Sequence, residues 1–159
     1  MRIALTSDEK YPVHRTVMAE LAKRGHTVVA MGAIASEQEE PWAEAAEAAA
    51  QLVAGSGCDE GIFFCWSGTG ITIAANKVAG IRAALCTDAP TTVAARIWNH
   101  ANVLCLSNRS LSDDVAKEIL AAWFDTALDP KGATGVSALA GVENHHRRVC
   151  DCGIGRVTK

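Results

Sequence analysis

Five short apolar segments alternate with segments of helical periodicity over the first 126 residues, and this alternation constrains the fold more than any other feature. The apolar segments predict strands at residues 2–6, 27–31, 60–65, 82–87 and 102–106. Helices are predicted at residues 13–24, 41–54, 70–78, 90–98 and 112–126. Strands that are almost continuously apolar and are separated by helices are typical of a parallel sheet with both faces covered. The sequence therefore predicts a Rossmann-like α/β fold, in which a five-stranded parallel sheet lies between two helical layers.

The overall composition is that of an ordinary globular protein. Of the 159 residues, 49% are hydrophobic and 21% are charged, and the net charge is −3. This charge gives no electrostatic basis for binding nucleic acid, and no apolar run approaches the ~20 residues that span a bilayer. The amino terminus passes directly into the first predicted strand, without the long apolar region of a signal peptide. We therefore expect a cytoplasmic protein with no nucleic-acid or membrane partner.

The regular alternation ends near residue 126, which divides the chain into two parts. Residues 1–126 are predicted to form a single α/β domain. Residues 127–159 are glycine-rich and polar with no clear period, so they provide no core of their own. Such a tail is expected to pack on a neighbouring subunit. A second polar stretch, at residues 32–40, is predicted to be a loop.

The cysteines are scattered in a way that does not indicate a disulfide framework. They are Cys58, Cys65, Cys86, Cys105, Cys150 and Cys152. Reduced thiols in a cytoplasmic α/β protein fit this scatter better. The two cysteines of the tail lie near His145 and His146, but their spacing is not that of the usual zinc sites. We expect no metal, and a redox or metal protein built on Cys65 and the tail remains an alternative.

In parallel sheets of this kind, ligands bind beyond the carboxyl ends of the strands. The segments that follow strands there are residues 7–10, 65–70, 87–88 and 107–109. In the second of them, Cys65 leads through a glycine-rich turn into a helix. Backbone N–H groups in such a turn can hold a phosphate or a developing oxyanion, and a thiol at the strand end is placed to act as a base. The alternative is a tight turn in which Cys65 is core filler.

Two segments carry a resemblance to a known family. The run Ile73-Ala-Ala-Asn-Lys-Val-Ala-Gly-Ile-Arg-Ala-Ala-Leu-Cys86 and the run Asn99-His-Ala-Asn-Val-Leu104, followed by Arg109, resemble type B ribose-5-phosphate isomerases and galactose-6-phosphate isomerase subunits. The similarity covers residues 1–126 well and the tail loosely. It implies a five-stranded parallel sheet and a homodimer or tetramer with an active site shared between two subunits. It also implies the interconversion of aldose and ketose phosphates through an enediolate, with no metal and no cofactor.

The resemblance assigns roles to the turn that follows the third strand. Cys65 matches the family's thiolate base, and a thiol at a glycine-rich turn near a helix start can have a lowered pKa. Ser67 falls near the reacting oxygens. The N–H groups of Gly68, Thr69 and Gly70 match the anion hole of the family.

The remaining matches lie in other segments. Asp8 resembles a ligand of a sugar hydroxyl, although a helix N-cap is an equal alternative for it. Asn99 matches a substrate-binding asparagine. Arg109 and Arg148 match arginines that bind the phosphate, and Arg148 resembles one that the partner subunit donates. Either arginine taken alone is also typical of a solvated surface charge.

The chain departs from the family pattern at residues that matter for the substrate. Trp98 stands where the family has a histidine that opens the furanose ring, and indole cannot shuttle a proton. His100 replaces that histidine only if the loop is rearranged. Glu9 replaces the histidine of an Asp-His pair, and its charge repels a phosphate unless Lys10 or an arginine offsets it. Trp66, together with Ser67, stands where the family has a Gly-Thr pair.

These matches and departures together predict the function. We expect an aldose–ketose isomerase that acts on a small or open-chain sugar phosphate, a tetrose or pentose phosphate, with Cys65 as base. A tetrulose 4-phosphate needs no ring opening, because its terminal oxygen is blocked. The alternatives are an isomerase of a sugar without phosphate, and a sugar-phosphate binder or subunit that is inactive without a different partner chain.

Overall fold

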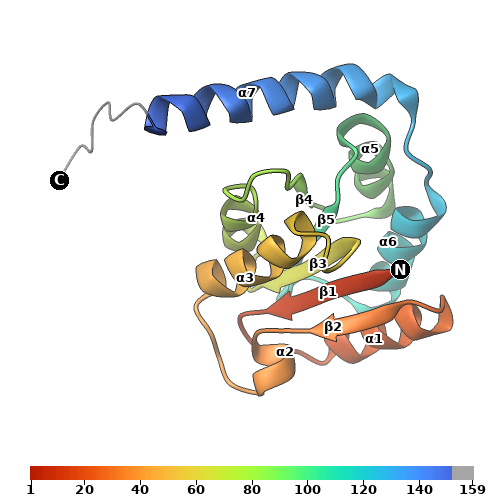
Figure 1. Ribbon diagram of the computed structural model, residues 1–159. Helices are drawn as coiled ribbons and strands as arrows, with labels where there is room; N and C mark the ends of the chain where they lie inside the picture. The colour runs from red at the N-terminus through yellow and green to blue at the C-terminus, as the bar shows by residue number, and fades with distance from the viewer. Residues whose placement is uncertain (152–159) are drawn as a thin grey trace.

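The computed structural model describes the backbone of residues 1–151 and the side chains of residues 1–146 (Figure 1). Its centre is a sheet of five parallel strands in the order β2-β1-β3-β5-β4. The strands are β1 (Arg2–Ser7), β2 (Thr27–Ala30), β3 (Glu60–Cys65), β4 (Ala83–Leu85) and β5 (Val103–Ser107). The three central strands are in register at Leu5, Ile62 and Leu104. The predicted five-stranded parallel sheet is therefore confirmed.

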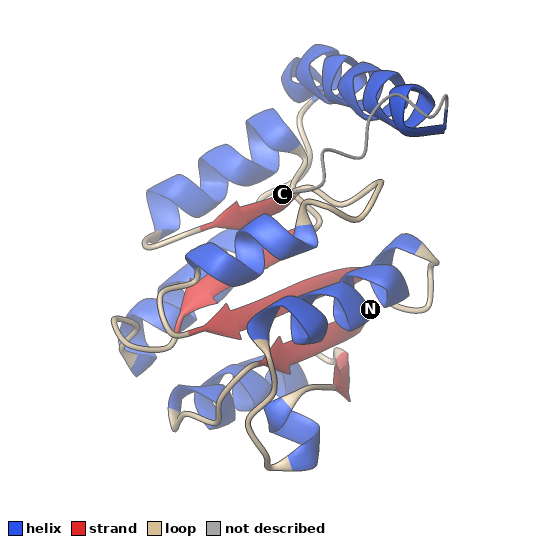
Figure 2. Cartoon of the chain, turned by 90° about the vertical axis from the view of Figure 1, so that its left-hand side faces the viewer, coloured by secondary structure: helices blue, strands red, loops and turns tan. Residues whose placement is uncertain are grey.

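Helices cover both faces of this sheet (Figure 2). One face packs against α1 (Val13–Lys23), α5 (Ala89–Asn99) and α6 (Asp113–Asp125) in a cluster that includes Ile62 and Phe64. The other face packs against α3 (Trp42–Ala54) and α4 (Thr69–Ala75) in a cluster that includes Phe63 and Cys65. Alternate residues of β3 thus enter opposite cores, which is why this strand is apolar after its first residue, Glu60.

Polar side chains fix the starts of two helices that flank the sheet. Ser112 caps α6, because its hydroxyl accepts a hydrogen bond from the Val115 N–H at 3.3 Å. Asp88 caps α5 and accepts from the Thr91 N–H at 2.7 Å. Asp88 lies just beyond the carboxyl end of β4. Helix α5 therefore starts at the edge of the sheet where the strands end and runs back to the edge where the strands begin.

The structure corrects several predicted boundaries. A short helix, α2 (Ala33–Ser36), lies inside the segment that was predicted to be a loop. Strand β4 spans three residues and is shorter than predicted, and α4 ends at Ala75 rather than near residue 78.

The largest correction concerns the tail, which was predicted to have no periodic structure. It forms a 3-10 turn, η1 (Pro130–Gly132), and a helix of 19 residues, α7 (Ala133–Asp151). This helix lies outside the two helical layers, beyond α5 (Figure 1). Through His146, only Val136 and Glu143 of α7 are partly buried. The Glu143 carboxylate accepts a hydrogen bond from the Gly80 N–H at 3.0 Å.

Among the described helices, none is both long enough and apolar enough to pass through a lipid bilayer.

Candidate active site

The carboxyl ends of the three central strands bring three loops together at one edge of the sheet. The loop after β5 is bonded to the loop after β3 through backbone groups: the Asn108 N–H donates to the Cys65 carbonyl at 3.0 Å, and the Arg109 N–H donates to the Trp66 carbonyl at 3.1 Å. The Ser107 hydroxyl also donates to the Trp66 carbonyl, at 2.9 Å. These three bonds fix the segment that carries Cys65 relative to the segment that carries Arg109.

Cys65 is the last residue of β3, and its side chain is 4% exposed. It belongs to the core cluster on the α3 and α4 side of the sheet, together with Phe63, Ile71 and Cys105. The thiol therefore lies at the end of the strand, at the border between this core and the loops. This is the position that a base at the strand end requires, and it is also compatible with the packing role that the sequence left open.

Gly68 forms the sharp turn that follows Cys65. Its φ is +78°, and a Cβ there would lie 2.5 Å from Cδ1 of Leu85 and 3.1 Å from the Leu106 backbone, so only glycine fits. The Gly68 N–H, which the resemblance assigned to the anion hole, donates instead to the Cys65 carbonyl at 3.2 Å. It is therefore already engaged within the turn.

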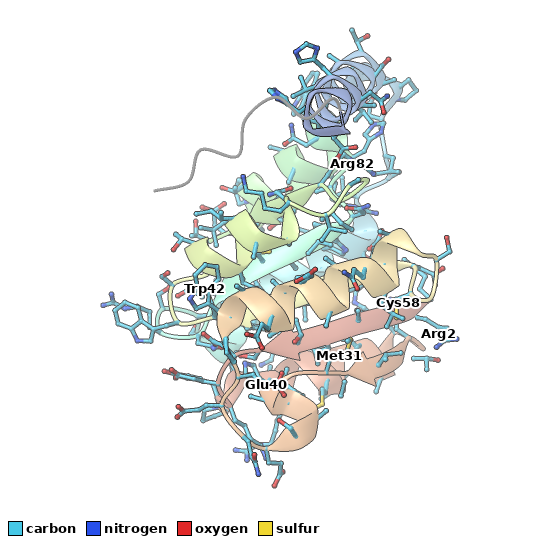
Figure 3. The ribbon with its side chains drawn as sticks, turned by 60° about the vertical axis from the view of Figure 1, so that its left-hand side comes forward. Arg2, Met31, Glu40, Trp42, Cys58 and Arg82 are labelled. Carbon is cyan, nitrogen blue, oxygen red and sulfur yellow. The ribbon has the colours of Figure 1, made fainter. Side chains whose placement is uncertain are left out.

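The rest of the turn is polar on one side and covered by an indole on the other. The hydroxyls of Ser67 and Thr69 lie 2.6 Å apart, and the Thr69 N–H points to the Ser67 hydroxyl at 3.4 Å. Trp42 stands at the start of α3 (Figure 3). Its indole lies over Gly70, where a Cβ would be 3.1 Å from the ring. Two hydroxyls and a wall formed by an aromatic ring thus stand at the start of α4.

Asp8 follows β1 and is 8% exposed. Burial raises the pKa of its carboxyl, the neighbouring Glu9 raises it further, and the backbone N–H groups of Glu9, Asp8 and Trp66 oppose this rise. Among the described residues, its Oδ1 atom is buried and has no hydrogen-bond partner. The residue at the N-cap of α1 is Pro12, so the alternative of Asp8 as a helix cap is wrong. The carboxyl can accept a hydrogen bond from a ligand hydroxyl.

Glu9 and Lys10 follow Asp8, but their charges do not neutralise each other. Burial raises the pKa of the Tyr11 hydroxyl, and the nearby Glu9 carboxylate raises it further. Lys10 forms an ion pair with Glu37 instead. The negative charge of Glu9 therefore adds to that of Asp8 at this edge.

A buried hydrogen-bonded chain behind the loops was not predicted. His14 Nε2 donates to Asn108 Oδ1 at 2.8 Å, and Asn108 Nδ2 donates to the Ser7 hydroxyl at 3.0 Å. The Ser7 hydroxyl donates in turn to the Glu9 carbonyl at 2.6 Å, and His14 Nδ1 accepts from the Tyr11 N–H at 3.3 Å. Burial lowers the pKa of His14, and the hydrogen bond that His14 donates to Asn108 opposes this fall. No local sequence signal marks this series of hydrogen bonds, because His14 and Asn108 are 94 residues apart.

Within one chain, the structure does not bring Trp98 and Asn99 to Cys65. Both residues lie at the end of α5, which has returned to the edge where the strands begin. Asn99 lines a hollow of about 410 Å³ along the free side of β4, together with Arg82, Leu85 and residues of α5 and α7. This position could have been predicted from the parallel topology, because each crossover helix starts where the strands end and finishes where the strands begin.

His100, which was expected to replace the missing histidine only in a rearranged loop, is held elsewhere. His100 Nε2 is hydrogen-bonded to the Asp129 carbonyl oxygen at 2.7 Å, so it is held against the start of the tail. The side chain of Arg148 lies outside the described residues.

The described cysteines are free thiols, namely Cys58, Cys65, Cys86 and Cys105. Within the described part of the chain, no group of three or more histidine, cysteine or acidic side chains is arranged to hold a metal ion. The side chains of Cys150 and Cys152, on which the metal alternative depends, lie outside the described residues.

Comparison with known proteins gives one consistent picture. The sequence profile of the family described as Ribose/Galactose Isomerase matches residues 3–138. The chain is 39% identical over 108 residues to ribose-5-phosphate isomerase B of Escherichia coli, which covers 68% of this chain and 72% of that protein. It is 30% identical over 149 residues to D-erythrulose-4-phosphate isomerase of Pectobacterium atrosepticum, which covers 93% of this chain and 98% of that protein.

A solved structure agrees with these matches. The structure of ribose-5-phosphate isomerase B from Clostridium thermocellum superimposes with a TM-score of 0.85 at 34% identity, covering 92% of this chain and 99% of that one.

Proposed function

Because the chain belongs to the Ribose/Galactose Isomerase family, and is thus an aldose–ketose isomerase, we propose that its substrate is a small or open-chain sugar phosphate, a tetrose or pentose phosphate. In the proposed reaction, the Cys65 thiolate removes the proton from the carbon beside the carbonyl. The electron pair of that C–H bond forms an enediolate. The thiol then returns a proton to the neighbouring carbon, while a hydroxyl proton moves between the two oxygens.

One observation carries this proposal: a thiol, a carboxyl and a guanidinium follow three adjacent strands at one edge of the sheet. Cys65 would serve as base, and the unpartnered oxygen of Asp8 would accept a sugar hydroxyl. Arg109, bonded through its backbone to the Cys65 loop, would bind the anionic end of the substrate. The Ser67 and Thr69 hydroxyls lie where they could donate to the enediolate oxygens.

Two observations favour a four-carbon substrate over ribose 5-phosphate. Trp98 replaces the ring-opening histidine that the resemblance leads one to expect. The relative that acts on erythrulose 4-phosphate matches along nearly the whole chain. A tetrulose phosphate cannot close a furanose ring, so an enzyme for it has no need of that histidine.

We further propose that the active site is shared between two copies of the chain. Trp98 and Asn99 lie at the opposite edge of the sheet from Cys65, so they can join it only from a partner subunit. Arg148 is proposed to come from the partner's α7 in the same way. A homodimer or tetramer would thus carry complete sites that a monomer lacks.

A second candidate is an isomerase of a sugar without phosphate, and Glu9 is the observation that favours it. The ammonium of Lys10 is paired with Glu37 and does not offset the charge of Glu9. In that case the anion site at Arg109 would be unused in the reaction, and removal of the phosphate would not weaken turnover.

The test is proton exchange in heavy water, followed by NMR, with tetrose, pentose and hexose sugars supplied with and without phosphate. We expect deuterium at the carbon beside the carbonyl of a tetrulose phosphate. Exchange only with sugars that lack phosphate would establish the second candidate. No exchange with any sugar, with folded wild-type protein, would contradict both and point to a binder or a subunit that needs a different partner chain.

A further inference from the structure

The side chains of Trp66 and Arg109 are in direct contact at the candidate active site. The guanidinium carbon of Arg109 lies over the indole of Trp66, 4.4 Å from its centroid. Trp66 is 52% exposed, so packing in the core does not explain the position of its indole. Cation–π contacts of this geometry are attractive and restrict the cation to the face of the ring.

The backbones of the two residues are joined as well. The Trp66 carbonyl accepts from the Arg109 N–H at 3.1 Å and from the Ser107 hydroxyl at 2.9 Å. Ring and guanidinium therefore extend from a shared, hydrogen-bonded frame. An arginine side chain otherwise loses considerable rotamer entropy when it is fixed in one place.

The N–H groups of Arg109 are left without an acidic partner. Among the described residues, no carboxylate forms an ion pair with Arg109, whereas Arg24 and Arg96 each have one. A guanidinium that stacks on a ring through its face keeps its N–H groups pointing outward in its own plane. They remain available to bind an oxyanion in a bidentate manner.

We infer that Trp66 is a positioning residue, which holds the guanidinium of Arg109 ready for the anionic end group of the substrate. This inference rests on the proposed function for the identity of the anion. Trp66 directly follows Cys65, so the contact between Trp66 and Arg109 also fixes the position of the anion site relative to the base. The spacing between them would then limit the length of sugar that can reach both.

The experiment compares Trp66→Leu and Trp66→Phe with the wild type, using the sugar phosphate that exchanges deuterium. For Trp66→Leu we expect KM to rise roughly three- to thirtyfold, the range of a cation–π contact, with kcat changed less than about twofold. Trp66→Phe keeps an aromatic face and should recover most of the affinity. Phe124→Leu is the matched control, because it removes the contact of Arg24 with an aromatic ring far from this edge. It should leave KM unchanged.

Two further measurements separate positioning from a merely structural role. In an Arg109→Gln background, Trp66→Leu should raise KM no further, since the two residues act as one unit. The side-chain Nε–H resonance of Arg109 should carry a ring-current shift that disappears in Trp66→Leu. Titration with inorganic phosphate should show the same loss of affinity as KM does.

The outcomes distinguish this inference from the proposed function. If the wild type turns over no sugar phosphate, the proposed function fails, and the phosphate titration and the NMR shift still decide the role of Trp66. An active enzyme in which Trp66→Leu leaves KM and phosphate affinity unchanged would overturn the inference. Additive effects in the double variant, or a fall in kcat alone, would overturn it as well.

Discussion

Nε2 of His14 donates a hydrogen bond of 2.8 Å to Oδ1 of Asn108, and this buried pair joins α1 to the loop that follows β5. Asn108 in turn donates a hydrogen bond to the hydroxyl of Ser7, at the end of β1. The loops that carry Asp8 and Arg109 are thus held together from behind by neutral polar groups, and the neutral form of His14 is part of that arrangement.

The first prediction concerns the pH dependence of stability. Burial lowers the pKa of His14 in the folded protein below its ordinary value near 6.5. The unfolded chain therefore binds a proton at a higher pH than the native state does. The stability that this histidine contributes is present above about pH 6.5 and is lost as the pH falls toward its folded pKa. Urea unfolding between pH 8 and pH 5 should show this loss.

The matched variant for that experiment is His14→Gln, which keeps a donor for Asn108 but does not titrate. Its free energy of unfolding should change less with pH than that of the wild type. His26→Gln should flatten the dependence less, because His26 is only partly buried although its pKa is lowered too. Equal slopes for His14→Gln and wild type would contradict the prediction.

The second prediction concerns the turn at Gly68, which follows Cys65. Gly68→Ala should lower the free energy of unfolding by about 3 kcal/mol, because a positive φ and a crowded Cβ add their costs. Gly25→Ala is the control: its φ is +73° but a Cβ there meets nothing within 4 Å, so about 1 kcal/mol is expected. If the two variants unfold at the same urea concentration, crowding by Leu85 is not a significant cost.

The third prediction concerns the buried ion pair at the edge where the strands begin. The Glu60 carboxylate accepts from Arg96 at 2.8 Å and from the Trp123 indole N–H at 2.6 Å. Glu60→Ala leaves the Arg96 charge without its partner, and a loss of about 3 kcal/mol is expected in urea unfolding. Glu47→Ala, on the exposed face of α3, should change stability by less than about 0.5 kcal/mol. Similar losses for both variants would exclude the ion pair as the cause.

The fourth prediction follows from the proposed base. Cys65→Ala should lower kcat by roughly three orders of magnitude, with little change in the thermal midpoint or in phosphate affinity. Cys58→Ala removes a buried thiol from the other edge of the sheet and should retain kcat. If Cys65→Ala turned over substrate at nearly the wild-type rate, Cys65 would not be the base, and its role would be packing in the core.

The fifth prediction uses the replaced histidine. Trp98→His should not raise activity on D-erythrulose 4-phosphate, whereas isomerisation of ribose 5-phosphate should rise at least about tenfold, since ring opening gains a general acid–base. Steady-state kinetics on both substrates provide the measurement, and Trp98→Phe serves as the control, because it removes the indole without adding a group that can shuttle a proton. Without a gain on the cyclic sugar, the shape of the pocket rather than the missing acid–base would set the preference.

The sheet and its covering helices were predictable because their signals are local and periodic. Strand β3 is apolar in every residue after Glu60, and Ser112 marks the start of α6. The tail helix was missed for a physical reason. Gly135 and Gly141 lie inside α7, and little of its described part, through His146, is buried by its own chain, so no apolar face stands out in the sequence.

The candidate site was predictable only in part. The segments at the carboxyl ends of β1, β3 and β5 could be identified because topology alone places them together. The link between His14 and Asn108 could not, because it joins residues with no common motif. The contact of Arg109 with Trp66 was missed because each residue was interpreted singly, one as an anion ligand and the other as a bulky substitution.

The exposure of α7 has a thermodynamic consequence. A helix of 19 residues whose described side chains, through His146, gain so little packing from their own chain is only marginally stable in water. Its helix–coil equilibrium is therefore linked to whatever covers it, which in our proposal is a second copy of the chain. Hydrogen exchange would reveal this linkage: amide protection in α7 is expected to increase with protein concentration more steeply than amide protection in β3, which is buried within a single subunit.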